Sequence, residues 1–214
     1  MSRIPLALRL RRKRHRDIAA AQDLIVGELY RASRDAVIHG GTAIWRCYGG
    51  NRFSEDIDVY MPKDKKALEK FFQGLKKSGL ILKKKKMGDS SLYSRIGGDG
   101  AIVRFEVLFK SVGGVLGHYE TADGNYLPVY TLTPEQLIGE KVSAYLKRRK
   151  IRDLYDIFFL LKQVKEPGEV SEPLERLLGQ FKNPVDEKEL RVLIIEGLVP
   201  DVEKMLEYIR RWAK

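Results

Sequence analysis

Two aspartates separated by one residue, Asp56 and Asp58, are the strongest chemical signal in the sequence. In an extended strand, residues two apart point to the same side, so these carboxylates would lie together while Ile57 and Val59 pack into the core. Neighbouring carboxylates repel each other unless a cation neutralises them, and oxygen ligands suit Mg²⁺, which also takes oxygens from substrate phosphates. The spacing therefore favours a metal site. The alternative is an exposed strand end with two solvated acids.

A third acid, Glu106, stands in the apolar stretch Ile102–Phe109. Strand alternation puts Arg104 and Glu106 on one face and Val103, Phe105 and Val107 on the other. Joining the metal site is one explanation for an acid in this position. Pairing near Arg104, or contact with solvent, is the other.

A glycine-rich turn, Gly40-Gly41-Thr42, follows the short apolar run Ala36–His39 and precedes a predicted helix over 42–48. Glycine lets the backbone approach a ligand closely, and the first amides of a helix form an anion site. The turn alone is ordinary chemistry. Together with carboxylates on adjacent strands, it predicts a two-metal phosphoryl-transfer site.

These residues need a sheet to hold them, and the hydrophobic pattern supplies one. Beyond the run at 36–39, the sequence predicts strands at 57–61, 80–86, 91–96, 101–109 and 126–132, helices at 17–34 and 65–77, a hairpin turn at 97–100 and a glycine-rich loop at 113–125. After a capping box at Thr133–Gln136 the chain reads as helices only, at 134–147, 153–164, 172–182, 186–196 and 200–213. We therefore expect an α+β protein with a basic arm at 1–16, an α/β domain at 17–132 and a helical domain at 133–214.

Composition narrows the function classes. Lys and Arg total 40 against 29 Asp and Glu, a formal net charge of +11, which favours a polyanionic partner such as nucleic acid, with a lysine-rich solubilising surface as the alternative. The single Cys47 and three scattered histidines exclude disulfides and the common zinc sites. No apolar segment is long enough to cross a membrane, so we expect a protein of the reducing cytoplasm.

The positive charge gathers in the N-terminal arm, in Lys83–Lys86 and in Lys147–Lys150. Such clusters bind phosphates with little sequence choice. The run at 83–86 is equally consistent with a solvated strand edge that blocks aggregation. Four aromatic residues are candidates for base stacking, although core packing explains each as well: Tyr30, Trp45, Tyr48 and Tyr93.

The pattern Gly40-Gly41, Asp56-x-Asp58 and a later acid, Glu106, resembles the DNA polymerase β-type nucleotidyltransferase superfamily. Two blocks are more specifically similar to the AbiEii/AbiGii toxin family. The first is Gly40–Ile44 with Tyr48 and Arg52–Asp58, and the second contains Lys141, Arg148–Lys150 and Arg152-Asp153-x-x-Asp156. The resemblance covers about residues 36–162. It implies a mixed, twisted sheet with flanking helices, followed by a C-terminal helical bundle.

The resemblance also implies roles. Asp56 and Asp58 would bind Mg²⁺, or Mn²⁺, and Glu106 would be a third ligand or activate the acceptor hydroxyl. The predicted catalytic set also includes Lys141, Asp153 and Asp156. The predicted nucleotide-binding residues are Gly40, Gly41, Thr42, Arg52, Ser54, Lys141 and Arg152. Two plainer readings stay open: an Arg152–Asp156 ion pair along the helix, and Asp153 as a helix N-cap.

The implied activity is nucleotide transfer from a nucleoside triphosphate to an acceptor hydroxyl. Family members act as toxins of toxin–antitoxin systems linked to phage defence, and some modify the acceptor ends of transfer RNA. An RNA acceptor and a cognate antitoxin are therefore the expected partners, with no membrane. The alternatives are transfer to a small molecule or a protein, or a nucleic-acid-binding protein with a degenerate site.

Overall fold

The computed structural model describes residues 4–98 and 100–213, and its contacts divide the chain into two units. The first unit contains the chain up to Cys47 together with Ser54–Leu132. The second contains Tyr48–Phe53 and the chain from Thr133 onward. The short segment Tyr48–Phe53 thus packs with the C-terminal helices, whereas a division by sequence alone places it in the α/β domain.

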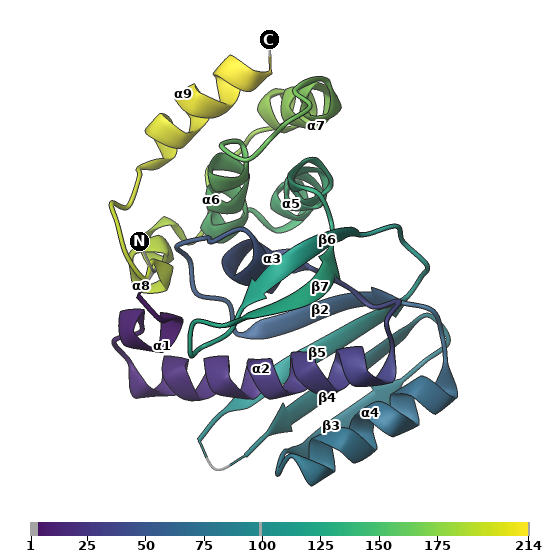
Figure 1. Ribbon diagram of the computed structural model, residues 1–214. Coiled ribbons are helices and arrows are strands. Elements are labelled where there is room, and N and C mark those ends of the chain that lie inside the picture. The colour runs from purple at the N-terminus through teal and green to yellow at the C-terminus, as the bar shows by residue number, and fades with distance from the viewer. Residues whose placement is uncertain (1–3, 99, 214) are drawn as a thin grey trace. The chain divides into compact units, whose positions relative to one another are not determined.

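A mixed sheet is the centre of the first unit (Figure 1). Over the described residues its strands are β1 Val37–His39, β2 Asp56–Met61, β3 Ile81–Met87, β4 Ser91–Gly97, β5 Ile102–Phe109, β6 Val115–Glu120 and β7 Tyr126–Thr131. They lie in the order β3-β4-β5-β2-β1-β7-β6. The pairs β2–β5 and β1–β7 are parallel and the others are antiparallel. The predicted mixed sheet is confirmed.

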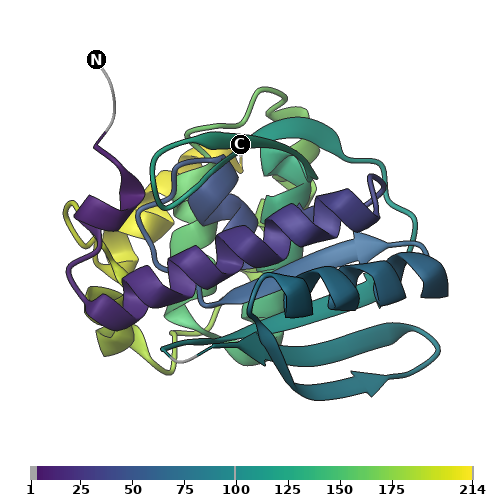
Figure 2. The ribbon, with the colours of Figure 1, turned by 60° about the horizontal axis from the view of Figure 1, so that its bottom comes forward.

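Helices cover one face of this sheet, because alternate residues of its central strands are apolar. Ile57 and Val59 of β2, like Val103 and Phe105 of β5, are fully buried. Helices α2 Lys13–Ala32 and α4 Lys65–Lys77 lie side by side on that face (Figure 2). The rings of Phe71 on α4 and Phe105 on β5 have centroids 4.8 Å apart. The remaining helices of this unit are α1 Leu6–Arg9 and α3 Gly40–Cys47.

The predicted loop at 113–125 is wrong, because it contains strand β6. Its glycines suggested a turn, but a Cβ on Gly117 would lie 2.9 Å from the side chain of Thr131 on the paired strand. The glycine therefore allows close strand packing here. The predicted turn at 97–100 includes Asp99, which lies outside the described residues.

The N-terminal basic segment is folded from residue 4 onward. Leu6 and Leu10 are buried, and helix α2 begins at Lys13, four residues before its predicted start. The apolar residues of this segment thus pack into the first unit while most of its arginines stay exposed.

The second unit is helical, as predicted. Its elements are α5 Pro134–Arg148, α6 Ile151–Leu160, α7 Gly168–Gly179, a 3₁₀ turn Glu187–Glu189, α8 Leu190–Leu193 and α9 Val202–Trp212. The predicted capping box at Thr133 is present. The single helix predicted at 186–196 is wrong, because Ile194 is extended and pairs with Arg52. Among the described residues, no helix is long and apolar enough to cross a membrane.

Candidate active site

The sheet register brings the predicted acids together on the face opposite α2 and α4. Strand β5 lies parallel to β2, so Asp56 is level with Arg104 and Asp58 with Glu106. Strand β4 continues both rows on the other side of β5. One row is therefore Arg95–Arg104–Asp56 and the other is Tyr93–Glu106–Asp58. Acids distant in the sequence become immediate neighbours in the sheet.

Asp56 is held by a cation and by the glycine-rich turn. Arg104 forms a two-pronged ion pair with its carboxylate, with Nε 2.7 Å from Oδ1 and Nη2 on Oδ2. The Thr42 hydroxyl donates a hydrogen bond to the backbone carbonyl of Asp56. Thr42 thereby ties the start of helix α3 to the start of β2.

The surroundings of Glu106 change its acidity. Burial raises its pKa, and the negative charge of Asp58 raises it further, while the Arg104 charge acts in the opposite direction. A carboxylate with a raised pKa beside another carboxylate is typical of a site that holds a cation or moves a proton.

Gly40 has a steric reason to be glycine. Its φ is +70°, and a Cβ at this position would lie 2.2 Å from Oδ2 of Asp58. The backbone of the glycine turn therefore lies directly against the second aspartate. Helix α3 begins at Gly40, two residues before its predicted start, and Gly41 and Thr42 are buried in its first turn.

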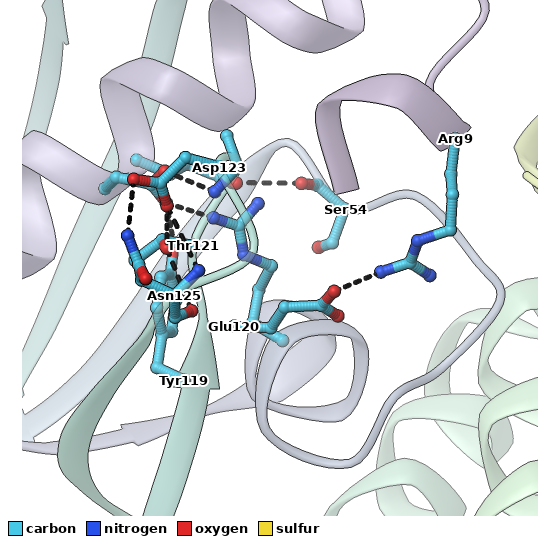
Figure 3. A network of polar contacts seen from close by, with 11 residues as sticks. Arg9, Ser54, Tyr119, Glu120, Thr121, Asp123 and Asn125 are labelled. Atoms are coloured by element: carbon cyan, nitrogen blue, oxygen red, sulfur yellow. Dashed lines mark hydrogen bonds and ion pairs between the residues drawn. The ribbon is translucent and has the colours of Figure 1, made fainter. Parts of the chain in front are cut away.

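Ser54, two residues before Asp56, is positioned through its backbone. Gln22 of α2 donates a hydrogen bond to the Ser54 carbonyl, with Nε2 and O 2.9 Å apart. Figure 3 shows this contact at one side of a polar network that also includes Tyr119 and the turn Thr121–Asn125.

The next residue of α2, Asp23, is the hub of that network. It accepts hydrogen bonds from the Ala122 amide at 2.7 Å and the Tyr119 hydroxyl at 3.2 Å, and it pairs with the buried Arg46. Burial raises the pKa of Asp23, and the Arg46 charge opposes that rise. Sequence reasoning missed Gln22, Asp23 and Arg46. The sequence offered one signal for these residues, since each stands next to apolar residues in a predicted helix.

The acid cluster has the donor chemistry of a divalent-cation site. Its carboxylate oxygens come from adjacent strands, and the like charges of Asp58 and Glu106 oppose each other. Within residues 4–98 and 100–213, no three His, Cys, Asp or Glu side chains are grouped closely enough to hold a metal, and Asp56 is paired with Arg104. A divalent cation would suit these oxygens only if Arg104 released Asp56 and the carboxylates moved closer together.

The second unit has its own buried ionic cluster. Asp156 of α6 accepts from Arg52, with Nε–Oδ1 and Nη2–Oδ2 both 2.8 Å, and lies 2.7 Å from the ammonium of Lys141. Asp153 lies 3.6 Å from the same ammonium and forms a two-pronged pair with Arg148. Four residues of the cluster are buried: Asp153, Asp156, Arg52 and Lys141. The cluster thus fixes the position of the Lys141 ammonium.

These contacts exclude both of the simpler explanations for the second block, an Arg152–Asp156 ion pair and Asp153 as a helix N-cap. Burial by itself raises the pKa of Asp156, but the Arg52 and Lys141 charges outweigh it and hold the pKa below its ordinary value. Asp156 therefore serves these two cations, and an Arg152–Asp156 helix pair does not describe it. Asp153 is not the N-cap either, because Lys150 takes that position. Arg152 is half-buried on the same helix.

Comparison with protein-family models decides the family. The model described as "Nucleotidyl transferase AbiEii toxin, Type IV TA system" matches residues 28–202. The chain belongs to this family. It is therefore a member of a nucleotidyltransferase toxin family, as the two motif blocks predicted. No curated protein matches it in a sequence search.

Solved structures show the same fold at low sequence identity. JHP933 from Helicobacter pylori is 22% identical, with a TM-score of 0.66 over 94% of this chain and 91% of that one. MenT4, the nucleotidyltransferase toxin Rv2826c from Mycobacterium tuberculosis H37Rv, is 18% identical, with a TM-score of 0.64 over 97% and 86%. The antibiotic-resistance factor ANT(2'')-Ia is 14% identical, with a TM-score of 0.50 over 76% and 92%. This AbiEii family member thus has a nucleotidyltransferase fold.

Proposed function

We propose that this protein transfers a nucleoside monophosphate from a nucleoside triphosphate to a hydroxyl of RNA, such as a transfer RNA end. It would act as the toxin of a toxin–antitoxin system, with a cognate antitoxin as its partner. The observation that carries the proposal is the placement of Asp58 beside Glu106 and against Gly40. Carboxylates next to a glycine turn at a helix start are the parts that phosphoryl transfer needs.

The three acids would bind a metal ion together, and Glu106 has a second proposed role. Asp56, Asp58 and Glu106 would hold Mg²⁺, with Mn²⁺ as a substitute, and the ion would supply neutralisation of the developing phosphate charge. The raised pKa of Glu106 also suits it to accept the proton of the attacking hydroxyl. Both roles for Glu106 remain in the proposal.

The glycine turn of the first unit would bind the triphosphate. The backbone amides at Gly41 and Thr42 offer donors to its terminal phosphates, and Ser54 orients the adjoining turn. Lys141 would contribute a compact charge, with Asp153 and Asp156 orienting its ammonium.

The contacts of the two neighbouring arginines sharpen their roles. Arg52 already donates to Asp156 and to the Phe53 carbonyl, so we assign it the positioning of Asp156 and Lys141. Arg152, half-buried on α6, stays a candidate for the triphosphate.

A labelled-triphosphate assay tests the proposal. The full chain is incubated with each α-labelled nucleoside triphosphate, Mg²⁺ and total RNA, and label on RNA is counted. Asp58→Asn should lower transfer by at least about a hundredfold, because charge stabilisation supplies most of this catalysis. The matched control, Asp201→Asn at an exposed helix N-cap, should transfer at the wild-type rate. Equal transfer by wild type and Asp58→Asn would refute the enzyme assignment.

A small-molecule acceptor is the second candidate, because ANT(2'')-Ia has been solved in complex with adenylyl-2''-tobramycin. Aminoglycosides carry several amines and are cations at neutral pH. The face beside Asp56 carries Arg95 and Arg104, which would repel such a substrate. Repeating the assay with aminoglycosides in place of RNA separates the two candidates.

A further inference from the structure

A row of cations lies beside the acids on the open face of the sheet. Strand β3 places Lys84 level with Arg95 on β4, and Arg95 is level with Arg104 on β5. The three side chains extend from the sheet edge to Asp56, and all three are exposed. Side chains facing each other across antiparallel strands lie about 5 Å apart.

Like charges placed directly opposite destabilise a sheet, so this row needs a compensating anion. Asp56 supplies one for Arg104. Arg95 makes no ion pair among the described residues. The row thus has more positive charge than the sheet itself neutralises, and the excess would be larger if Asp56 held a metal ion instead of Arg104.

An aromatic ring accompanies the cations. Tyr93 occupies the neighbouring row between Lys86 and Glu106, and it is half-buried. The Lys84 ammonium lies 6.0 Å from the centre of its ring. A tyrosine ring beside a line of cations is the combination with which proteins hold single-stranded nucleic acid, by stacking a base and neutralising the backbone.

Tyr93, Arg95 and Arg104 share one cleft with the first aspartate, Asp56, and Lys84 lies outside its lining. A cavity of ≈ 520 Å³ is lined by Tyr93, Arg95, Arg104 and Asp56, and also by Arg14 and Glu55. Arg14 and Glu55 pair with each other at 3.3 Å, so they add little net charge. The net positive charge of the cleft therefore comes from Arg95 and Arg104.

We propose that Lys84, Arg95 and Arg104 bind the phosphates of a single-stranded RNA acceptor and that Tyr93 stacks on one of its bases. This inference rests on the proposed function, because it places the acceptor strand beside the acids that would perform the transfer. Arg104 exchanges Asp56 for an acceptor phosphate as the site is loaded. The row guides the strand end from the edge of the sheet towards Asp56.

RNA binding without triphosphate tests this site. Anisotropy of a fluorescein-labelled single-stranded RNA is measured over a salt series for wild type, Arg95→Ala and the exposed charge-matched control Arg210→Ala. Arg95→Ala should weaken binding and lower the salt slope by about one, whereas Arg210→Ala should change neither. Arg95→Lys keeps the positive charge and should retain the salt slope. This variant separates the effect of the charge from that of the guanidinium shape.

The tyrosine is tested with the same probe. Tyr93→Leu keeps the bulk but removes the aromatic ring, so single-stranded RNA should bind roughly tenfold more weakly. Binding of a duplex of the same sequence should not change, because its bases are already stacked. Circular dichroism confirms that each variant is folded.

The two proposals fail in different ways. If Arg95→Ala and Tyr93→Leu bind RNA as the wild type does, this acceptor site is refuted even where label transfer persists. If the RNA affinities change as expected but no labelled triphosphate reacts, the residues are confirmed as a site for single-stranded RNA, and both the proposed function and the acceptor role are lost. In an active enzyme, Arg95→Ala should raise the KM for RNA and leave the KM for the triphosphate unchanged.

Discussion

A single glycine controls the position of the second aspartate. Gly40 has a left-handed backbone conformation, and its missing side chain leaves the space that the Asp58 carboxylate occupies. The same residue therefore satisfies two requirements, a turn that only glycine adopts easily and a close approach to an acid. The glycine motif contributes to the site by sterics as well as by its amides.

Replacing this glycine should damage the site and the fold together. Gly40→Ala forces a Cβ into Asp58 and strains the backbone, so the free energy of unfolding should fall by about 1–3 kcal/mol. Label transfer should fall with it. Urea unfolding of the purified full chain measures the first effect.

Gly27→Ala is the matched control for this prediction. Gly27 lies inside helix α2, and a Cβ there meets nothing within 4 Å. Alanine should therefore stabilise the protein by about 0.5–1 kcal/mol. Equal effects at Gly40 and Gly27 would contradict the steric account.

At the scale of elements, strand order assembles the acid cluster. The alternation of β2 and β5 shows from sequence which residues share a face, and the structure agrees. Contacts between segments distant in the sequence decide which strands are neighbours. The local sequence pattern therefore cannot show that Asp58 lies level with Glu106. The family resemblance supplied the pairing that periodicity alone leaves open.

The same reason explains what sequence reasoning missed. The partner of Asp56 is Arg104 on another strand, and the partner of Asp156 is Arg52, about a hundred residues away. Local rules offer a nearby partner, Arg152, for Asp156 as one alternative. Strand β6 was read as a loop, because glycine signals both turns and close strand packing.

The helices of the second unit depend on their buried ionic cluster. Asp156→Asn keeps the size of the side chain but removes the charge that Arg52 and Lys141 share. The buried Arg52 would then lack its counter-ion and Lys141 would keep only Asp153, 3.6 Å away, so we expect a loss of about 3–5 kcal/mol in the free energy of unfolding. Denaturant unfolding checks this.

The pH dependence of that effect has a definite sign. Because the folded chain lowers the pKa of Asp156, its contribution is present above the ordinary pKa of aspartate and is lost as pH falls through the lowered value. Wild type and Asp156→Asn should therefore converge in stability only in strong acid. The Lys204 amide also lowers the pKa of Asp201, but that carboxylate is fully exposed, so Asp201→Asn should show a much smaller gap. An equal gap at the two positions would argue against a specific role for Asp156.

At the scale of the whole molecule, the sheet face that holds Asp56, Asp58 and Glu106 also holds a positively charged partner, Arg104. The Arg104 guanidinium neutralises Asp56 through a two-pronged ion pair. The folded state should therefore not require a divalent metal, unlike small domains that fold around zinc. Thermal unfolding in a chelator should remain cooperative, with a midpoint within a few degrees of that in Mg²⁺.

Arg104→Ala makes this prediction sharper. Without the guanidinium, repulsion among the acids should lower the midpoint in chelator, and Mg²⁺ should restore it. A wild-type protein that loses its cooperative transition in chelator would show that the arginine does not replace the metal. An unchanged Arg104→Ala midpoint would show the same.

The lysine strand at the edge of the sheet has a consequence for handling the protein. Strand β3 is paired on one side only, and Lys83–Lys86 are all exposed along it. A charged edge resists the addition of strands from other molecules, so these lysines keep separate chains from joining into larger sheets. Replacing all four lysines would remove the proposed phosphate contact of Lys84 and promote aggregation at the same time. Single substitutions set back from this edge, as at Arg95, avoid confusing insolubility with loss of binding.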